Sequence, residues 1–155
     1  MTNKKIKEIL YQHKLWLTDH SKGKRANFSW ENLRGVNLCR ANLRSAELRW
    51  TNLSNADLSG ADLRWVDLGG AKIIGADLSG VDLSNADLRG IDLRGVDLTK
   101  IKDYETTGVW LNYKLVPIRQ IIIWQKMIAN KDKSTAILYK NTWMADECKK
   151  VLINT

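Results

Sequence analysis

Large apolar residues recur at every fifth position of residues 26–100, and most have a second apolar residue two positions before them. The segment holds fifteen consecutive five-residue units without an insertion, and thirteen have leucine at the centre, the exceptions being Phe28 and Ile73. The place two before the centre is Ala, Val or Ile except at Glu31 and Thr51. Helices repeat every 3.6 residues and strands every two, so this period predicts neither. The chain must instead turn a corner in each unit.

The remaining places of each unit hold residues that favour turns. Asn or Asp precedes the central residue in all but two units, which have Glu47 and Lys72. Asn and Asp side chains bond nearby backbone amides in turns, and glycine relieves turn strain. Glycine ends seven units: Gly35, Gly60, Gly70, Gly75, Gly80, Gly90 and Gly95. The pattern predicts a solenoid of stacked coils with a leucine core.

This A-(D/N)-L-x-x pattern closely resembles the repeats of pentapeptide-repeat proteins and covers 75 of the 155 residues. The resemblance implies an all-β fold, a right-handed quadrilateral β-helix with four units per coil. Fifteen units then give about four coils, and a strand spacing of about 4.8 Å gives a rod about 18 Å long. Residues 13–17 and 23–28 look like the lead-in helix of some bacterial and phage-like members.

Residues 1–25 are expected to form an N-terminal helical cap on the β-helix of residues 26–100. A helix is predicted over residues 3–18, with Thr2 or Asn3 as N-cap. Its apolar face holds Ile6, Ile9, Leu10, His13 and Leu17. This face would cover the first leucine layer.

Glu31 stands at an inward position of the first coil, where a buried carboxylate needs a partner. His13, Lys24 or Arg25 could supply it. We expect a structural ion pair at this position.

Residues 101–155 have no repeats and are expected to form a C-terminal cap that is mainly β. β-favouring residues at 118–128 and 134–139 predict a hairpin, and residues 142–145 a further short strand. Because the apolar residues of 118–128 are nearly continuous, a helix is the alternative there. The region weakly resembles β-rich tails that follow the repeats in related proteins. An unpaired edge or apolar patch on this cap would favour a homodimer, and both monomer and dimer stay open.

The net charge of +8 is uneven: residues 1–25 carry +5, residues 101–155 carry +4, and the repeat carries −1. No apolar run is long enough to span a bilayer, and no signal peptide is evident. We therefore expect a cytoplasmic protein without a membrane partner. Cys39 and Cys148 have no metal-ligand spacing and are expected to be reduced.

Outward side chains define a candidate interaction surface. At 20 residues per coil, Trp30 and Trp50 share a column, and Arg49 and Arg89 lie on the same face. Arg44 and Arg64 share another column, with Trp65 beside Arg64. Tryptophan and arginine dominate interaction hot spots. The alternative is that these side chains only stabilise neighbouring coils.

No catalytic, cofactor-binding or metal-binding residues are predicted. His13 and His20 have no Ser or Cys near them in sequence, and the glycines follow the repeat instead of forming a phosphate-binding loop. We therefore expect a non-enzymatic scaffold or interaction module for a protein partner that the sequence does not identify.

Two alternatives involve nucleic acid. Some family members mimic DNA and bind gyrase or topoisomerase, but a short, nearly neutral rod disfavours this function. Residues 56–100 keep it open, with eight acidic residues against five basic ones. The other alternative is nucleic-acid binding through the basic ends, with an affinity that falls steeply with salt.

Overall fold

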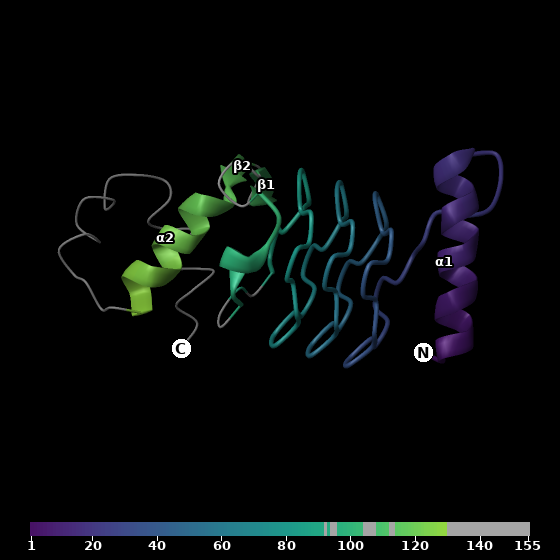
Figure 1. The fold of residues 1–155 in the computed structure, drawn as a ribbon, viewed down its shortest axis with the longest axis horizontal. Coiled ribbons are helices and arrows are strands. Elements are labelled where there is room, and N and C mark those ends of the chain that lie inside the picture. The colour runs from purple at the N-terminus through teal and green to yellow at the C-terminus, as the bar shows by residue number, and fades with distance from the viewer. Residues whose placement is uncertain (92, 94–95, 104–107, 112–113, 130–155) are drawn as a thin grey trace.

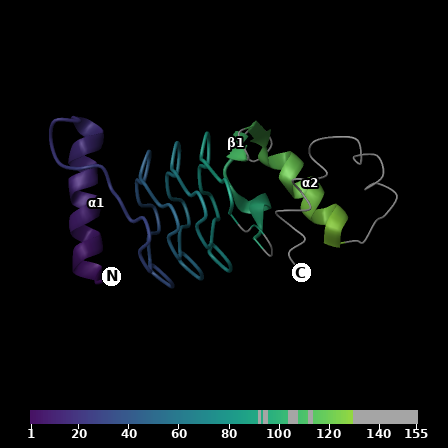
Figure 2. The same cartoon turned by 180° about the vertical axis from the view of Figure 1, so that it is seen from behind.

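The computed structural model describes residues 1–91, 93, 96–103, 108–111 and 114–129. Its elements follow the chain from one end of the molecule to the other (Figures 1 and 2). They are helix α1 (Asn3–Thr18), the short 3-10 helix η1 (Leu98–Lys100), strands β1 (Gly108–Leu111) and β2 (Lys114–Pro117), and helix α2 (Ile118–Ala129). The repeat forms the stacked coils between α1 and η1.

The coils return to the same column every 20 residues, as the sequence predicts. Parallel bridges join Asn32 to Asn52 and Asp62 to Asp82. These bridges are isolated residue pairs, because each side of a coil is only one unit long before the next turn. The repeat is therefore held by bridges, and the regular strands of the described residues lie after it.

All five backbone amides of residues 61–65 have hydrogen-bond partners. The first amide closes a turn by donating to the Leu58 carbonyl (2.9 Å), and the second donates to Ala41 in the preceding coil (3.0 Å). The third and fifth donate to carbonyls of the following coil (2.9 and 3.0 Å). The fourth donates to the side chain of Asp62 (3.1 Å). Asn or Asp is thus the residue that completes hydrogen bonding within the unit.

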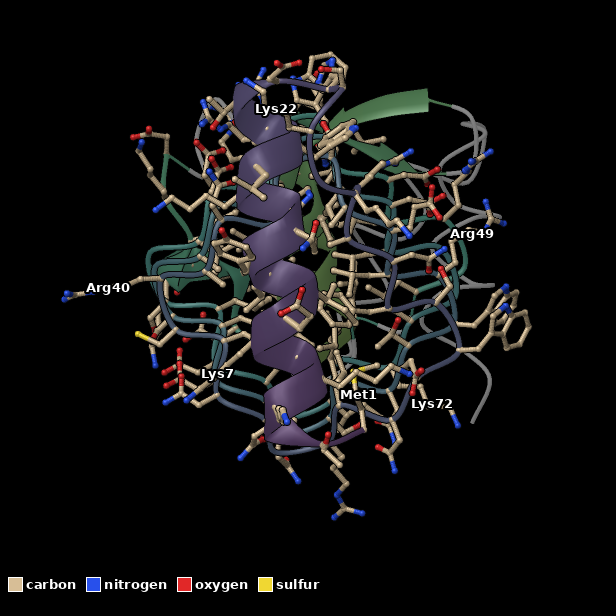
Figure 3. All side chains as sticks on the ribbon, turned by 90° about the vertical axis from the view of Figure 1, so that its right-hand side faces the viewer. Met1, Lys7, Lys22, Arg40, Arg49 and Lys72 are labelled. Atoms are coloured by element: carbon tan, nitrogen blue, oxygen red, sulfur yellow. The ribbon has the colours of Figure 1, made fainter. Side chains whose placement is uncertain are left out.

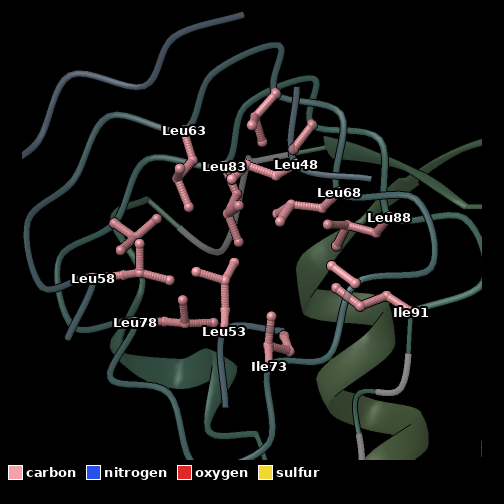
Figure 4. Packing of buried hydrophobic residues seen from close by; sticks show 14 of the residues in the cluster. Leu48, Leu53, Leu58, Leu63, Leu68, Ile73, Leu78, Leu83, Leu88 and Ile91 are labelled. Carbon is pink, nitrogen blue, oxygen red and sulfur yellow. The ribbon is translucent and has the colours of Figure 1, made fainter. Parts of the chain in front are cut away.

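The leucine column forms the core, with the described central residues of the units all buried (Figure 4). The inward Thr51 hydroxyl donates to the Phe28 carbonyl at 2.8 Å, so its polar group is satisfied. Glu31 is not buried, and the prediction of its partner is wrong. The Glu31 side chain is 36% exposed, and its carboxylate pairs with Lys5 of α1 at 3.7 Å.

The fifth position of the unit requires a positive φ, which explains its glycines. The described glycines that end units have φ between 66° and 71°. Other residues at this position adopt the same conformation, among them Trp30 (68°) and Trp50 (57°). Side chains with a Cβ pay a steric cost there, about 1–2 kcal/mol per residue.

The N-terminal helix agrees with its prediction. It begins at Asn3, and the Thr2 side chain is the N-cap, accepting from the Lys5 amide at 3.3 Å. Ile6 and His13 are its buried residues and join α1 to the first coil. Within the described residues, neither long helix has the length and hydrophobicity needed to cross a bilayer.

The C-terminal side differs from the hairpin prediction. Residues 118–128 lie in α2, so the strand prediction is wrong there and the helix alternative is confirmed. The observed hairpin pairs β1 with β2. The repeat's ladder continues into this region, because the Asn85 amide donates to the Gly108 carbonyl at 2.8 Å. The strands predicted for 134–139 and 142–145 lie outside the described residues, and the homodimer stays a prediction.

Candidate interaction surface

Trp30 and Trp50 stack on one edge of the rod. Their ring centroids are 5.4 Å apart, with planes inclined by 18°. The backbone fixes both residues, because the Trp30 amide donates to Arg49 in the next coil and the Trp50 amide to Gly69, both at 2.9 Å. The side chains still expose 75% and 50% of their surface. They form an ordered aromatic pair that faces solvent.

Two glycines of the next coil, Gly69 and Gly70, lie beside the Arg49 and Trp50 side chains. A Cβ atom built on Gly70 would overlap the six-membered ring of Trp50. A Cβ on Gly69 would lie 3.8 Å from the guanidinium carbon of Arg49. The first approach is an overlap and the second an ordinary contact, so it is Gly70 that leaves room for the side chain 20 residues earlier, Trp50. The sequence indicates this role only when residues 20 positions apart are compared.

The predicted surface residues surround a single side of the rod, here called the tryptophan face. It consists of residues 26–30, 46–50, 66–70 and 86–90, with the turn residues 44–45, 64–65 and 84–85 that lead into it. One edge carries Trp30, Trp50, Arg49 and Arg89, and the other carries Arg44, Arg64 and Trp65. Trp65 is 54% exposed, so both edges present aromatic surface.

Ion pairs neutralise the centre of the tryptophan face. Arg49 pairs with Asp67 at 3.2 Å, and Arg89 pairs with Asp87. Glu47 accepts from Asn27 at 2.7 Å and pairs with Arg25 at 3.0 Å. Arg25 was predicted as a possible partner of Glu31 and was not included in the candidate interaction surface, because its position depends on how the α1 loop meets the first coil. Figure 3 looks along the rod from the α1 end and shows Arg49 at its outer edge.

The second edge contains a bidentate pair between Arg64 and Asp62. The guanidinium donates to the carboxylate at 2.9 and 2.6 Å, and Asp82 lies 3.9 Å away. Burial would raise the pKa of Asp62, but the hydrogen bonds from Arg64 and the charges of Arg64 and Arg44 outweigh it and lower the pKa. The carboxylate stays charged at neutral pH and fixes Arg64 beside Trp65.

Other reactive side chains do not form a site in the described part of the chain. No three His, Cys, Asp or Glu side chains of the described residues are grouped so that they could hold a metal ion. His13 is buried and its Nδ1 accepts from the Ala26 amide at 3.0 Å, while His20 packs against Trp16 with centroids 4.4 Å apart. Cys39 is an exposed free thiol that accepts from the Ser59 hydroxyl at 3.3 Å.

Known sequences match the same part of the chain that forms the coils. The family described as pentapeptide repeats matches residues 24–60 and 61–99, in eight copies. The chain belongs to the pentapeptide-repeat family. No curated protein matches it. The matched residues include Gly70, so the glycine against which the Trp50 ring packs belongs to the family's repeat.

Solved structures of pentapeptide-repeat proteins are similar to this chain over part of their length. Full-length QnrB1, a plasmid-mediated fluoroquinolone resistance protein, is 22% identical, with a TM-score of 0.50 over 64% of this chain and 43% of QnrB1. That likeness shows the fold alone. HetL from the cyanobacterium Nostoc, involved in heterocyst differentiation regulation, is 29% identical, with a TM-score of 0.41 over 60% of this chain and 44% of HetL. This pentapeptide-repeat protein thus spans less than half of either structure.

Proposed function

We propose that this pentapeptide-repeat protein is a non-enzymatic interaction module whose tryptophan face binds a protein partner. The observation that carries the proposal is the exposed Trp30–Trp50 stack, held in place by Gly70. Ordered aromatic side chains lose little conformational entropy on binding, so they are efficient anchors for a partner. Exposed tryptophan and arginine are also the residue types enriched in binding hot spots.

Stability alone gives little reason for a tryptophan at position 30. Trp30 buries about a quarter of its surface, on the order of 60 Å², which contributes about 1.5 kcal/mol. Its left-handed backbone conformation costs about 1–2 kcal/mol. The two contributions nearly cancel, whereas glycine at the same position avoids the cost. Contact of the exposed ring with a partner would explain why tryptophan, and not glycine, stands at this position.

The charge pattern favours a protein over a polyanion at this face. Its carboxylates at Glu47, Asp67 and Asp87 all have basic partners, so the centre is close to neutral. Neutral, aromatic surface with fixed arginines is the composition of a protein–protein interface core. The function of the face would be recognition, with no chemical step.

The test replaces the exposed Trp65, on the other edge of the tryptophan face, with a photo-crosslinking residue in the full chain and identifies the covalent adduct in extracts of the source organism. Binding of that partner is then measured for Trp30→Ala/Trp50→Ala. We expect affinity to fall by at least about tenfold, the loss of one hot-spot contact. Gly70→Ala, which displaces the Trp50 ring without removing it, should weaken binding as well.

Two matched variants serve as controls. Ile74→Ala removes a 51% exposed apolar side chain from a different edge of the rod and should leave affinity unchanged. Gly80→Ala has the same positive φ as Gly70 but meets only backbone, at 3.8 and 3.9 Å. If the partner binds the double tryptophan variant as tightly as the wild type, the stack is only structural and the proposal is wrong.

A further inference from the structure

A second surface lies on α1 and consists of other residues. Lys4, Lys7, Tyr11 and Lys14 are spaced by three, four and three positions, so they form one stripe along the helix. All four are exposed, and Tyr11 exposes 57% of its surface. The buried side of α1 is elsewhere, at Ile6 and His13. The stripe therefore faces solvent, and Figure 3 shows Lys7 projecting from the side of the helix.

The lysines of this stripe have no acidic partner among the described residues. The structure pairs the neighbouring basic residues, joining Lys5 to Glu31 and Lys22 to Asp19. It gives no ion pair for the three stripe lysines within the same described ranges. The one acidic residue on this side of α1, Glu8, accepts a hydrogen bond from Gln12 at 3.0 Å. Three positive charges thus remain uncompensated along one line.

The first coil adds to this charge through the choice of Asn over Asp. Its turn-forming residues are Asn27, Asn32, Asn37 and Asn42. They accept the amide two residues on at 2.9–3.2 Å, and the described aspartates of later coils do so at 2.9–3.1 Å. The turn is the same with either residue, but asparagine carries no negative charge. The fold therefore does not require this choice.

The result is a charge gradient along the rod. Residues 1–45 contain ten basic and three acidic residues, a net charge of +7, while residues 46–100 contain six basic and nine acidic ones, a net charge of −3. Arg40, on the first coil, lies on the same side of the end view as Lys7 (Figure 3). The end covered by α1 is strongly electropositive, next to a rod of opposite sign.

We propose that this α1 end binds the phosphate backbone of double-stranded nucleic acid. Lysine neutralises phosphates but is depleted in protein–protein interfaces, which favours nucleic acid over an acidic protein. An interfacial membrane helix inserts an apolar face, but that of α1 is already buried at Ile6 and His13. The three lysines extend over about 15 Å of helix, enough to follow successive phosphates.

The test is fluorescence anisotropy of the full chain with a labelled 20-base-pair DNA duplex at several salt concentrations. Three phosphate contacts give a slope of about −2.7 in log affinity against log salt, a loss of about 40-fold between 50 and 200 mM. Lys4→Gln/Lys7→Gln/Lys14→Gln should remove most of that slope. Glutamine keeps the helix propensity of lysine, so circular dichroism should be unchanged.

A control with the same loss of charge is Lys72→Gln/Lys100→Gln/Lys126→Gln, whose exposed lysines lie away from α1. It should bind the duplex as the wild type does, and so should Trp30→Ala/Trp50→Ala, which separates this proposal from that of the tryptophan face. Equal losses in the two lysine triples would overturn the proposal. So would undetectable duplex binding at 50 mM salt, or equally tight binding of polyglutamate or phosphatidylserine vesicles.

Discussion

At the α1 end of the rod, burial and hydrogen bonding fix the protonation state of one polar residue, His13. Its ring is fully buried, stacks on Trp16 with centroids 5.6 Å apart, and accepts the Ala26 amide at Nδ1. Burial lowers the pKa of His13 below its ordinary value of 6.5; the backbone carbonyl of Arg44 opposes this shift and the charge of Arg25 adds to it. The neutral form therefore joins α1 to the first coil.

Acid should weaken this joint. Because the pKa of His13 is lowered on folding, the stabilisation is complete above about pH 6.5 and is lost as the pH falls through the folded-state pKa. Protonation at Nδ1 would leave the Ala26 amide without an acceptor, a cost of about 1–3 kcal/mol. Urea unfolding between pH 7.5 and 5 should show that decline in the wild type. His13→Asn, which keeps an acceptor but does not titrate, should lack it; matching profiles would contradict this account.

Residues within the repeat were more predictable than residues that join two elements. The roles of the glycines and of Asn or Asp follow from the five-residue period, and the structure confirms them. The partner of Glu31 does not, because it depends on where α1 lies across the first coil. Lys5, in the first turn of α1, contacts Glu31 only because α1 packs across the first coil in this position. No regular spacing in the sequence encodes the contact.

At the scale of elements, the same contrast separates the repeat from its caps. The helix of residues 118–129 contains Ile118, Ile121, Ile122 and Gln125, the spacing of one helical face, and the three isoleucines are buried. The strand prediction rested on the many β-branched residues of this segment. In the structure the segment is a helix, because a helix places its three buried isoleucines on the one face that packs against the last coil. The period of burial was present in the sequence, but the intervening apolar residues obscured it.

Gln125 shows how α2 closes the solenoid. The Val96 carbonyl stands where earlier coils accept an amide from the following coil, and here the Gln125 side-chain amide donates to it at 3.3 Å and to the Leu93 carbonyl at 2.7 Å. Gln125→Leu would leave the Val96 carbonyl without a donor, whereas Leu93 would still accept from the Val96 amide at 3.3 Å. We therefore expect the free energy of unfolding to fall by about 1–3 kcal/mol in chemical denaturation. Ile123→Ala, on the same helix at a 38% exposed position, should change it by less than about 0.5 kcal/mol. Equal effects would mean that Gln125 is not a cap.

At the scale of the whole molecule, charge separates this chain from a uniformly acidic rod. Residues 1–45 are positive, and the aspartates of the later coils are repeatedly paired, as Asp62 is with Arg64 and Asp67 with Arg49. The coil geometry is shared with QnrB1, but a shared fold does not carry a shared surface. Whatever binds to the coils therefore meets an alternation of charges in place of continuous negative charge.

A consequence can be measured on gyrase. A protein that imitates duplex DNA must present dense negative charge over a length comparable to the segment it replaces. The short rod and its basic α1 end offer neither, so we expect no inhibition of gyrase supercoiling at concentrations on the order of tens of micromolar. The assay includes a small-molecule gyrase inhibitor as positive control, and Lys4→Gln/Lys7→Gln/Lys14→Gln as a variant with three fewer positive charges. Inhibition by the wild type under these conditions would restore DNA mimicry. Inhibition by the variant alone would show that the lysine stripe is what prevents it.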